Sequence, residues 1–297
     1  MQLRGVNAPV DYAFVVLVEL CYAVAVLMLI SAGLAVVFGM MRVINLAHGE
    51  FLVLGGYAAI TAHAAGLNIY LSMLVVAPIV VGVFGLIVER LIIRFLYGRL
   101  INTMLATWGL SLAMMGGMTM IFGNTTTSIA TPIPGFAVGQ YQISGYNLFV
   151  IVMACLVALG LYITLKATRT GLIARGAMQN AEMASAFGYS PSRVYMMTFT
   201  AGAALTGLAG GVMAPLVGLL PTSGGNYIAK AFITVITGGA SVVAGAFSSA
   251  TILGVVSQTF TLLSTPAVGE IALLMVAVVL LRLLPTGITG RFFKDRV

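Results

Sequence analysis

Charged residues are scarce in this sequence. Only 7% of its 297 residues are Asp, Glu, Lys or Arg, whereas 61% are hydrophobic, and the mean hydropathy is +1.11. A water-soluble protein of this length needs a far more charged surface. The composition therefore excludes a soluble globular protein and indicates an integral membrane protein.

Several motifs are also missing. None of the three lysines, at positions 166, 230 and 294, follows a glycine, so the chain has no G-x-x-x-x-G-K-[ST] loop to hold a nucleotide phosphate. The zinc motif H-E-x-x-H is absent too. The two cysteines, Cys21 and Cys155, lie in separate apolar runs and predict neither a metal site nor a redox pair. We therefore expect no catalytic site and no cofactor in this chain.

What the sequence does have is a series of apolar runs. Runs of about 20 residues, enough for a helix to cross a hydrocarbon layer of about 30 Å, recur along the whole chain. They predict an all-α, polytopic transmembrane helical bundle that forms one domain over residues 1–297. The first run is too long for a signal peptide, so we expect it to be retained. We predict eight or nine spans, at about 12–38, 47–66, 69–92, 102–122, 145–166, 193–216, 227–240, 246–263 and 267–284.

Basic residues gather in three clusters at the ends of these runs. The positive-inside rule places such clusters in the cytoplasm, and this explains the basic balance better than binding to nucleic acid does. The alternation then predicts an external amino terminus, an external loop at 123–144 without Lys or Arg, and a cytoplasmic carboxyl terminus. The clusters are Arg90, Arg94 and Arg99; Lys166, Arg169, Arg175 and Arg193; and Arg282, Arg291, Lys294 and Arg296.

Two of the predicted spans are interrupted by glycines and polar residues, at 38–50 and 227–246. These interruptions predict broken or re-entrant helices, which transporters place near substrate paths. The first contains "RVINLAHGE", with Asn45, His48 and Glu50. Because a charge at the bilayer centre costs about 2.5 to 3.5 kcal/mol, such residues face the bundle interior, pair, or lie near the interface. Two interpretations stay open: a permeation route or its gate, and a turn in which His48 and Glu50 hydrogen-bond freed backbone groups.

Three further features have structural interpretations. Glu89 and Arg90 end a span and predict an ion-pair network at the membrane surface. Glu270 is expected to complement the amino-terminal end of its helix. Gly207 and Gly211 are four residues apart and predict close helix packing in lipid.

A polar stretch at 168–194, "TRTGLIARGAMQNAEMASAFGYSPSRV", breaks the apolar pattern. Thr170 can cap a helix over 171–187, Gly188 can end it in the left-handed conformation, and Ser190 with Pro191 can begin the next span. Small apolar residues along this helix suit docking to a partner protein. The alternative is a loop that only connects two spans.

At this point the chain resembles a known family, the LivH-type permease subunits of branched-chain amino acid ABC importers, a group that includes urea and short-chain amide permeases. The resemblance covers nearly the whole length. It rests on "RVINLAHGEFLVLGGYAA", "ERLIIRFLYGRL", "RTGLIARGAMQNAEMASAFGYSPSRVYMMTF", "GAALTGLAGGVMAP", "YIAKAFITVITGG" and "LLRLLPTGITG".

The resemblance implies a permease subunit, not an enzyme, in a bacterial inner membrane. It would import branched-chain or other hydrophobic amino acids together with a second permease of LivM type or an identical one. Two cytoplasmic ATPases would bind ATP and Mg²⁺, and a periplasmic protein would deliver the substrate. The cytoplasmic loop at about 167–192 would be the coupling helix, with Arg175, Gln179, Glu182, Ser185 and Gly188 at the ATPase. Matches to the early family signature assign the translocation pathway or its gate to Asn45, His48, Gly49 and Glu50.

Departures from the family pattern leave the substrate open. "VITGGASV" replaces the usual V-L-G-G-x-G-S, "MQN" at 178–180 is similar to the urea type, and Lys230 in "AKAF" is similar to the amino acid type. A urea or amide permease is therefore the first alternative. A secondary transporter or channel is the second, and it would need buried carboxylates for a coupling ion, for which Glu50 and Glu270 are the candidates.

Overall fold

The computed structural model describes residues 8–239 and 241–292, and most of this part of the chain is helical. The all-α prediction is confirmed. In these ranges seven helices are long and apolar enough to cross a membrane. They are α1 (Ala8–Met41); the span built from α3 (Ile69–Leu71), the π-helix η1 (Ser72–Val76) and α4 (Ala77–Leu91); α5 (Leu100–Phe122); α6 (Gly145–Ala167); α9 (Pro191–Met213); α11 (Val242–Leu263); and α12 (Pro266–Leu283).

Two shorter helices occupy the other two predicted spans. These are α2 (His48–Ala64), with 17 residues, and α10 (Gly224–Gly238), with 15. At 1.5 Å per residue they cover roughly 26 and 22 Å, less than the hydrocarbon thickness of about 30 Å. Both predicted interruptions are thus real breaks. After α1 the chain turns at Arg42, whose φ is +52°, and α10 ends at Gly239, whose φ is +86°.

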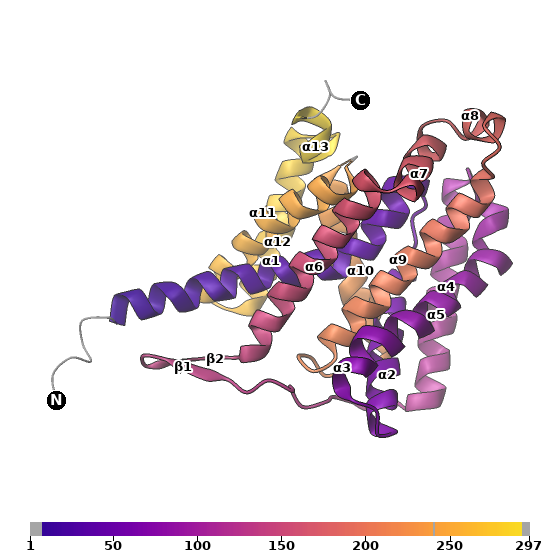
Figure 1. Cartoon of the computed structure of the whole chain (residues 1–297). Coiled ribbons are helices and arrows are strands. Elements are labelled where there is room, and N and C mark those ends of the chain that lie inside the picture. Colours follow the sequence, from indigo (N-terminus) through magenta and orange to yellow (C-terminus); the bar gives the residue numbers. More distant parts are fainter. Residues whose placement is uncertain (1–7, 240, 293–297) are drawn as a thin grey trace, which may run out of the picture.

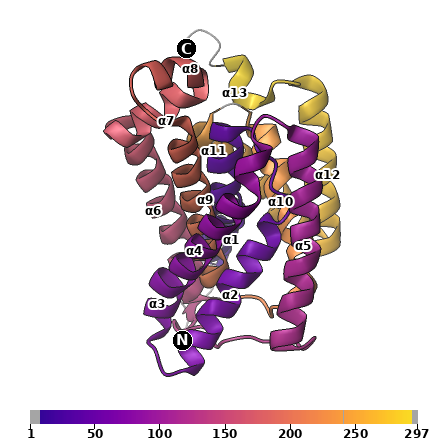
Figure 2. The ribbon, with the colours of Figure 1, turned by 90° about the vertical axis from the view of Figure 1, so that its right-hand side faces the viewer.

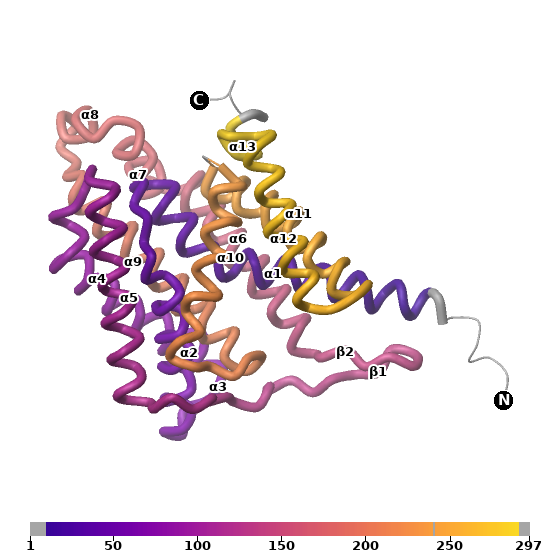
Figure 3. The backbone as a smooth tube through the Cα atoms, turned by 180° about the vertical axis from the view of Figure 1, so that it is seen from behind, coloured from indigo at the N-terminus to yellow at the C-terminus, as the bar shows by residue number. Residues whose placement is uncertain are grey.

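The connecting segments gather at two ends of the molecule (Figure 1). One end carries α7 (Arg169–Gln179), α8 (Ala181–Ala186) and α13 (Gly287–Phe292). Toward the other end lies an antiparallel hairpin of β1 (Phe136–Val138) and β2 (Tyr141–Ile143), and the view from behind shows the same separation (Figure 3). The sequence predicted only a loop at 123–144, without this hairpin. Residues 1–7, Lys294, Arg296 and the side chain of Arg291, on which part of the predicted orientation depends, lie outside the described residues.

Helix α9 lies in the middle of the bundle, packed against α1, α2 and α4 (Figure 2). A Cβ atom on Gly207 would come within 2.7 Å of the Ala77 carbonyl oxygen, and one on Gly211 within 2.7 Å of the Met73 carbonyl oxygen. The predicted close packing through these glycines is therefore confirmed. Such contact matters in a membrane because lipid tails are as apolar as leucine, so helix association depends on close van der Waals packing.

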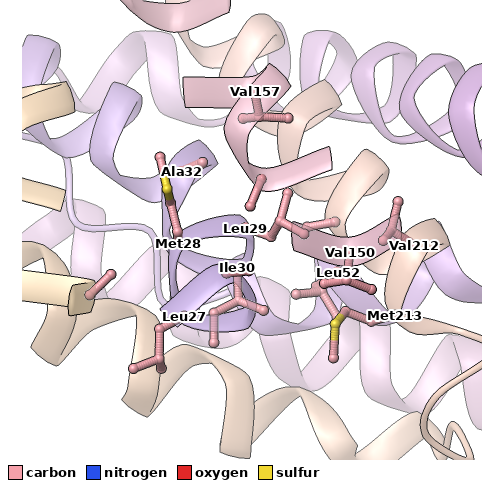
Figure 4. Close-up of a cluster of buried hydrophobic side chains, with 14 of the residues drawn as sticks. Leu27, Met28, Leu29, Ile30, Ala32, Leu52, Val150, Val157, Val212 and Met213 are labelled. Atoms are coloured by element: carbon pink, nitrogen blue, oxygen red, sulfur yellow. The ribbon is translucent and has the colours of Figure 1, made fainter. Parts of the chain in front are cut away.

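The apolar core brings together side chains from helices along the whole chain (Figure 4). Leu29 of α1, Leu52 of α2, Val150 of α6 and Val212 of α9 are all fully buried there. This core fixes α1 and α9 relative to the start of α2. It therefore positions the first of the two helix breaks.

Glu89 does not form the predicted ion-pair network. It is buried at the end of α4 and accepts a hydrogen bond from the Tyr97 hydroxyl, between η2 (Ile93–Leu96) and α5. Burial, together with this carboxylate, raises the pKa of Tyr97 above its ordinary value of 10.0, so the hydroxyl keeps its proton. The neutral Tyr97 hydroxyl bonds to Glu89 in place of the expected cation, because the segment after α4 covers the end of that helix.

Candidate functional site

The two short helices begin against each other inside the bundle. The amino-terminal turn of α2 crosses that of α10 so closely that a Cβ atom on Gly49 would lie 2.6 Å from the carbonyl carbon of Gly224. A Cβ atom on Gly224 would in turn lie 2.5 Å from Oε1 of Glu50. Only glycine at both positions permits this crossing. The carboxyl group of Glu50 is consequently held at the amino-terminal end of α10, where the helix dipole favours negative charge.

All three polar side chains of this junction are buried, with exposed fractions of 3% for Asn45, 2% for His48 and 4% for Glu50. Oδ1 of Asn45 accepts from the backbone N–H of Ala47 at 3.0 Å and so stabilises the turn before α2. Oε2 of Glu50 has no hydrogen-bond partner within the described chain. The junction therefore contains a carboxyl oxygen that is desolvated and unpaired, although it lies beside a helix end.

His48 connects α2 to two other helices. Its Nε2 lies 2.8 Å from the Ile30 carbonyl oxygen in α1, and its Nδ1 lies 3.3 Å from Oγ1 of Thr206 in α9. Because a carbonyl only accepts, Nε2 carries the ring proton. The Thr206 hydroxyl donates its single proton to the Gly202 carbonyl oxygen at 2.8 Å, so its contact with Nδ1 is a secondary one. The backbone group that His48 bonds lies inside the continuous helix α1 and is not one freed by the break. Asn45, His48, Gly49 and Glu50 do lie together, at the meeting point of α1, α2, α9 and α10.

The polar stretch at 168–194 forms two helices, not the one predicted over 171–187. Asn180 leaves the helical conformation after α7, and its Oδ1 accepts from the backbone N–H of Met183 at 2.9 Å, which caps α8. Thr168, not Thr170, caps α7, because its Oγ1 accepts from the N–H of Gly171 at 3.1 Å. Gly188 has the predicted left-handed conformation, with φ +84°, and Pro191 begins α9 as predicted.

Most polar side chains of this corner face outward. Gln179, Glu182, Ser185 and Gly188 are exposed, whereas Arg175 is half-buried and its Nε has no hydrogen-bond partner among the described residues. The buried side of the corner is made by small residues, including Ala177 and Ala184, that hold it to the bundle.

The corner also exposes large apolar side chains that were not predicted from the sequence. Phe187 is 75% exposed and Met183 is 55% exposed. They are four residues apart, a spacing that places side chains on one face of a helix, and this spacing is the signal that could have identified them. An exposed aromatic residue beside exposed polar ones at the end of a bundle is typical of a contact surface.

A separate cavity of about 630 Å³ lies between α1, α10, α11 and α12. Lys230 of α10 and Glu270 of α12 line it and form an ion pair at 2.5 Å. The expectation for Glu270 is therefore wrong: it lies beyond the first turn of α12 and pairs with a lysine of another helix. The four residues assigned to the pathway or gate are absent from the described lining of this cavity.

A bundle of long apolar helices, two short helices that meet inside it and a cavity that holds one ion pair among apolar side chains define a multi-pass membrane protein of the transporter type. A family model described as branched-chain amino acid transport system / permease component matches residues 16–284. The chain belongs to this family, and it is accordingly a permease component and not an enzyme.

Individual relatives align with almost the whole chain. The high-affinity branched-chain amino acid transport system permease protein BraD of Pseudomonas aeruginosa is 27% identical over 287 residues, covering 91% of this chain and 93% of the relative. LivH of Escherichia coli is 26% identical, with coverage of 91% and 92%. A probable LivH permease of Methanocaldococcus jannaschii is 27% identical, with coverage of 90% for both chains. No solved structure matches the chain.

Proposed function

We propose that this chain is the membrane permease subunit of an ATP-driven ABC importer for branched-chain amino acids. The observation that carries the proposal is the family match over residues 16–284, with relatives whose names describe branched-chain amino acid permeases. The whole chain forms one transmembrane domain in the bacterial inner membrane, surrounded by lipid.

The energy comes from other subunits. Two cytoplasmic ATPases bind ATP and Mg²⁺, a periplasmic binding protein delivers the substrate, and a second permease, of LivM type or identical, completes the pore. In this arrangement the carboxyl terminus and the loop at 167–192 are cytoplasmic. The placement of α7, α8 and α13 at the same end of the bundle supports a common side for the loop and the carboxyl-terminal region (Figure 1).

The ATPase docks on the corner formed by α7 and α8. Arg175, Gln179, Glu182, Ser185 and Gly188 are its polar contact positions, and the exposure of the last four supports this assignment. Asn180 gives the corner a fixed bend. ATP can bias transport only if the ATPase binds two arrangements of the bundle with different affinity, and a rigid capped corner is suited to transmit that difference.

Asn45, His48, Gly49 and Glu50 form the gate element of the pathway. The junction of α2 and α10 supports this assignment, since transporters commonly build substrate and ion sites from helix ends that meet inside the bundle. The desolvated Oε2 of Glu50 gives this junction a group whose partner can change when the helices move.

Reconstituted vesicles test the proposal. With its partners, the wild-type chain should take up leucine on addition of ATP and not urea; uptake of urea alone would establish the amide-type alternative. The combined change Gln179→Ala with Glu182→Arg should leave membrane insertion intact and reduce copurification of the ATPase and leucine uptake by tenfold or more, roughly the loss of one charge-assisted contact.

The matched control is Gln140→Ala, an exposed glutamine in the turn between β1 and β2. Copurification of the ATPase should be unchanged in this variant. Undiminished uptake and normal ATPase binding in the double variant would contradict the assignment of α7 and α8 as the docking site.

A further inference from the structure

The cavity between α1, α10, α11 and α12 combines one ion pair with an apolar wall. Lys230 and Glu270 are the charged members of its described lining. Apolar side chains of α1, α9 and α12 also line it, namely Val26, Leu27, Ile30, Met213, Leu273 and Leu274. Its volume of about 630 Å³ lies within the range of about 300 to 1,000 Å³ that is usual for small-molecule sites.

Both partners of the ion pair are partly exposed, and pairs of this kind contribute little to stability. Charged residues within membrane helices are rare and generally mark substrate or ion paths. Both partners are also accessible, since their side chains are 34% and 58% exposed.

Within the described part of the chain, the neighbouring polar side chains do not bond to this ion pair, so a ligand can bind to it. The third carboxylate of the region, Glu19 of α1, is already engaged by Asn147 Nδ2 at 3.1 Å and by Gln258 Nε2 at 3.5 Å. Lys230 and Glu270 have each other as their partner. A ligand that offers one cationic and one anionic group can therefore replace this single interaction with two.

We infer that the cavity is a transient binding site for the zwitterion of a branched-chain amino acid, with Lys230 holding the carboxylate and Glu270 holding the ammonium group. The branched side chain then lies on the apolar wall formed by α1 and α12. Charge is balanced before and after binding, because an internal ion pair is exchanged for two ion pairs with the ligand. Neutral urea or an amide offers no such exchange. This inference rests on the proposed function and specifies where the substrate is recognised.

Photolabelling of the reconstituted complex during turnover tests the site. The probe is photo-leucine, the diazirine analogue of leucine, and labelled peptides are identified by mass spectrometry. Labels are expected on the wall residues Leu27, Met213 and Leu273, and excess leucine but not urea should remove them. If the complex transports leucine but the labels lie elsewhere, the site is wrong and the proposed function stands; if it transports no leucine, both fail.

Variants separate recognition from helix packing. Lys230→Met and Glu270→Gln should each reduce labelling and leucine uptake by about tenfold or more, the loss typical of a charged hydrogen bond. The double variant Lys230→Met with Glu270→Met replaces the ion pair by an uncharged contact. It should therefore have the melting temperature of the wild type, while labelling is reduced as in the single variants. Normal labelling in this double variant would overturn the proposal.

The matched control is Lys166→Met at the end of α6, where the ammonium group lies 5.1 Å from the centroid of the Tyr162 ring and outside the cavity. Labelling and uptake should be unchanged in it. A loss equal to that of Lys230→Met would mean that any lysine removal has this effect, and would also overturn the proposal.

Discussion

The two polar stretches of this chain, 42–50 and 168–194, both interrupt the apolar pattern but have opposite environments. The first is largely buried from Val43 onward, with its histidine bonded to α1 and its asparagine bonded within its own turn; the second is largely exposed, and its polar side chains point away from the bundle. A polar run in an apolar protein can therefore turn inward to satisfy interrupted backbone or outward to meet a partner. The distinction matters because a substitution should affect stability in the first stretch and association in the second.

The largest difference is expected from adding one methyl group to a glycine in each stretch. Gly49→Ala should lower the free energy of unfolding by about 3 kcal/mol, because the new Cβ atom overlaps the backbone of Gly224, which cannot move aside. Gly176→Ala in α7 meets no atom within 4 Å and should raise it by about 0.5 to 1 kcal/mol. Unfolding by detergent titration measures both values. Equal effects would remove the distinction between the two stretches.

A smaller difference is expected from removing one polar side chain in each stretch. His48→Ala should cost about 2 kcal/mol, since it leaves the Ile30 carbonyl oxygen and the Thr206 hydroxyl without this partner. Gln179→Ala should change stability by less than about 0.5 kcal/mol, because its side chain is exposed. Melting temperatures of the two purified variants provide the comparison. A stable His48→Ala protein would mean that the junction does not depend on this histidine.

The smallest effect is expected within the exposed corner itself. Asn180→Ala removes the cap of α8 and should destabilise that helix by about 1 kcal/mol without unfolding the bundle. Limited proteolysis between α7 and α8 should become faster. Ser185→Ala is the control, because its hydroxyl only bonds back to the Ala181 carbonyl within the same helix. Equal proteolysis of the two variants would show that Asn180 does not fix the bend.

Much of the fold follows from the sequence because local patterns determine it. Apolar run length predicts the spans, Gly207 and Gly211 predict the close contact of α9, and Gly188 predicts the end of α8. The break at Asn180 escaped prediction although asparagine is a good cap. The residues around it fit a continuous helix equally well, and tertiary contacts of Ala177 and Ala184 decide between the two.

The site was less predictable, because its parts meet only in three dimensions. The crossing of Gly49 with Gly224 joins residues far apart in the chain, and so does the pairing of Lys230 with Glu270. Nothing in the spacing of Glu270 signals a lysine 40 positions earlier as its partner. The hydrogen bond from Tyr97 to Glu89 likewise depends on how residues 92–99 fold over the end of α4.

Helix α1 has 34 residues and a length of about 51 Å, well beyond the hydrocarbon thickness of about 30 Å, so it must tilt or extend past that layer. Figure 1 shows it as the long helix that reaches furthest from the bundle toward the amino terminus. Its middle also carries Tyr22, Val26 and Ile30, which form one wall of the cavity. Lipids with longer or shorter acyl chains demand a different slant of this helix. A change in the tilt of α1 would therefore move this wall of the cavity.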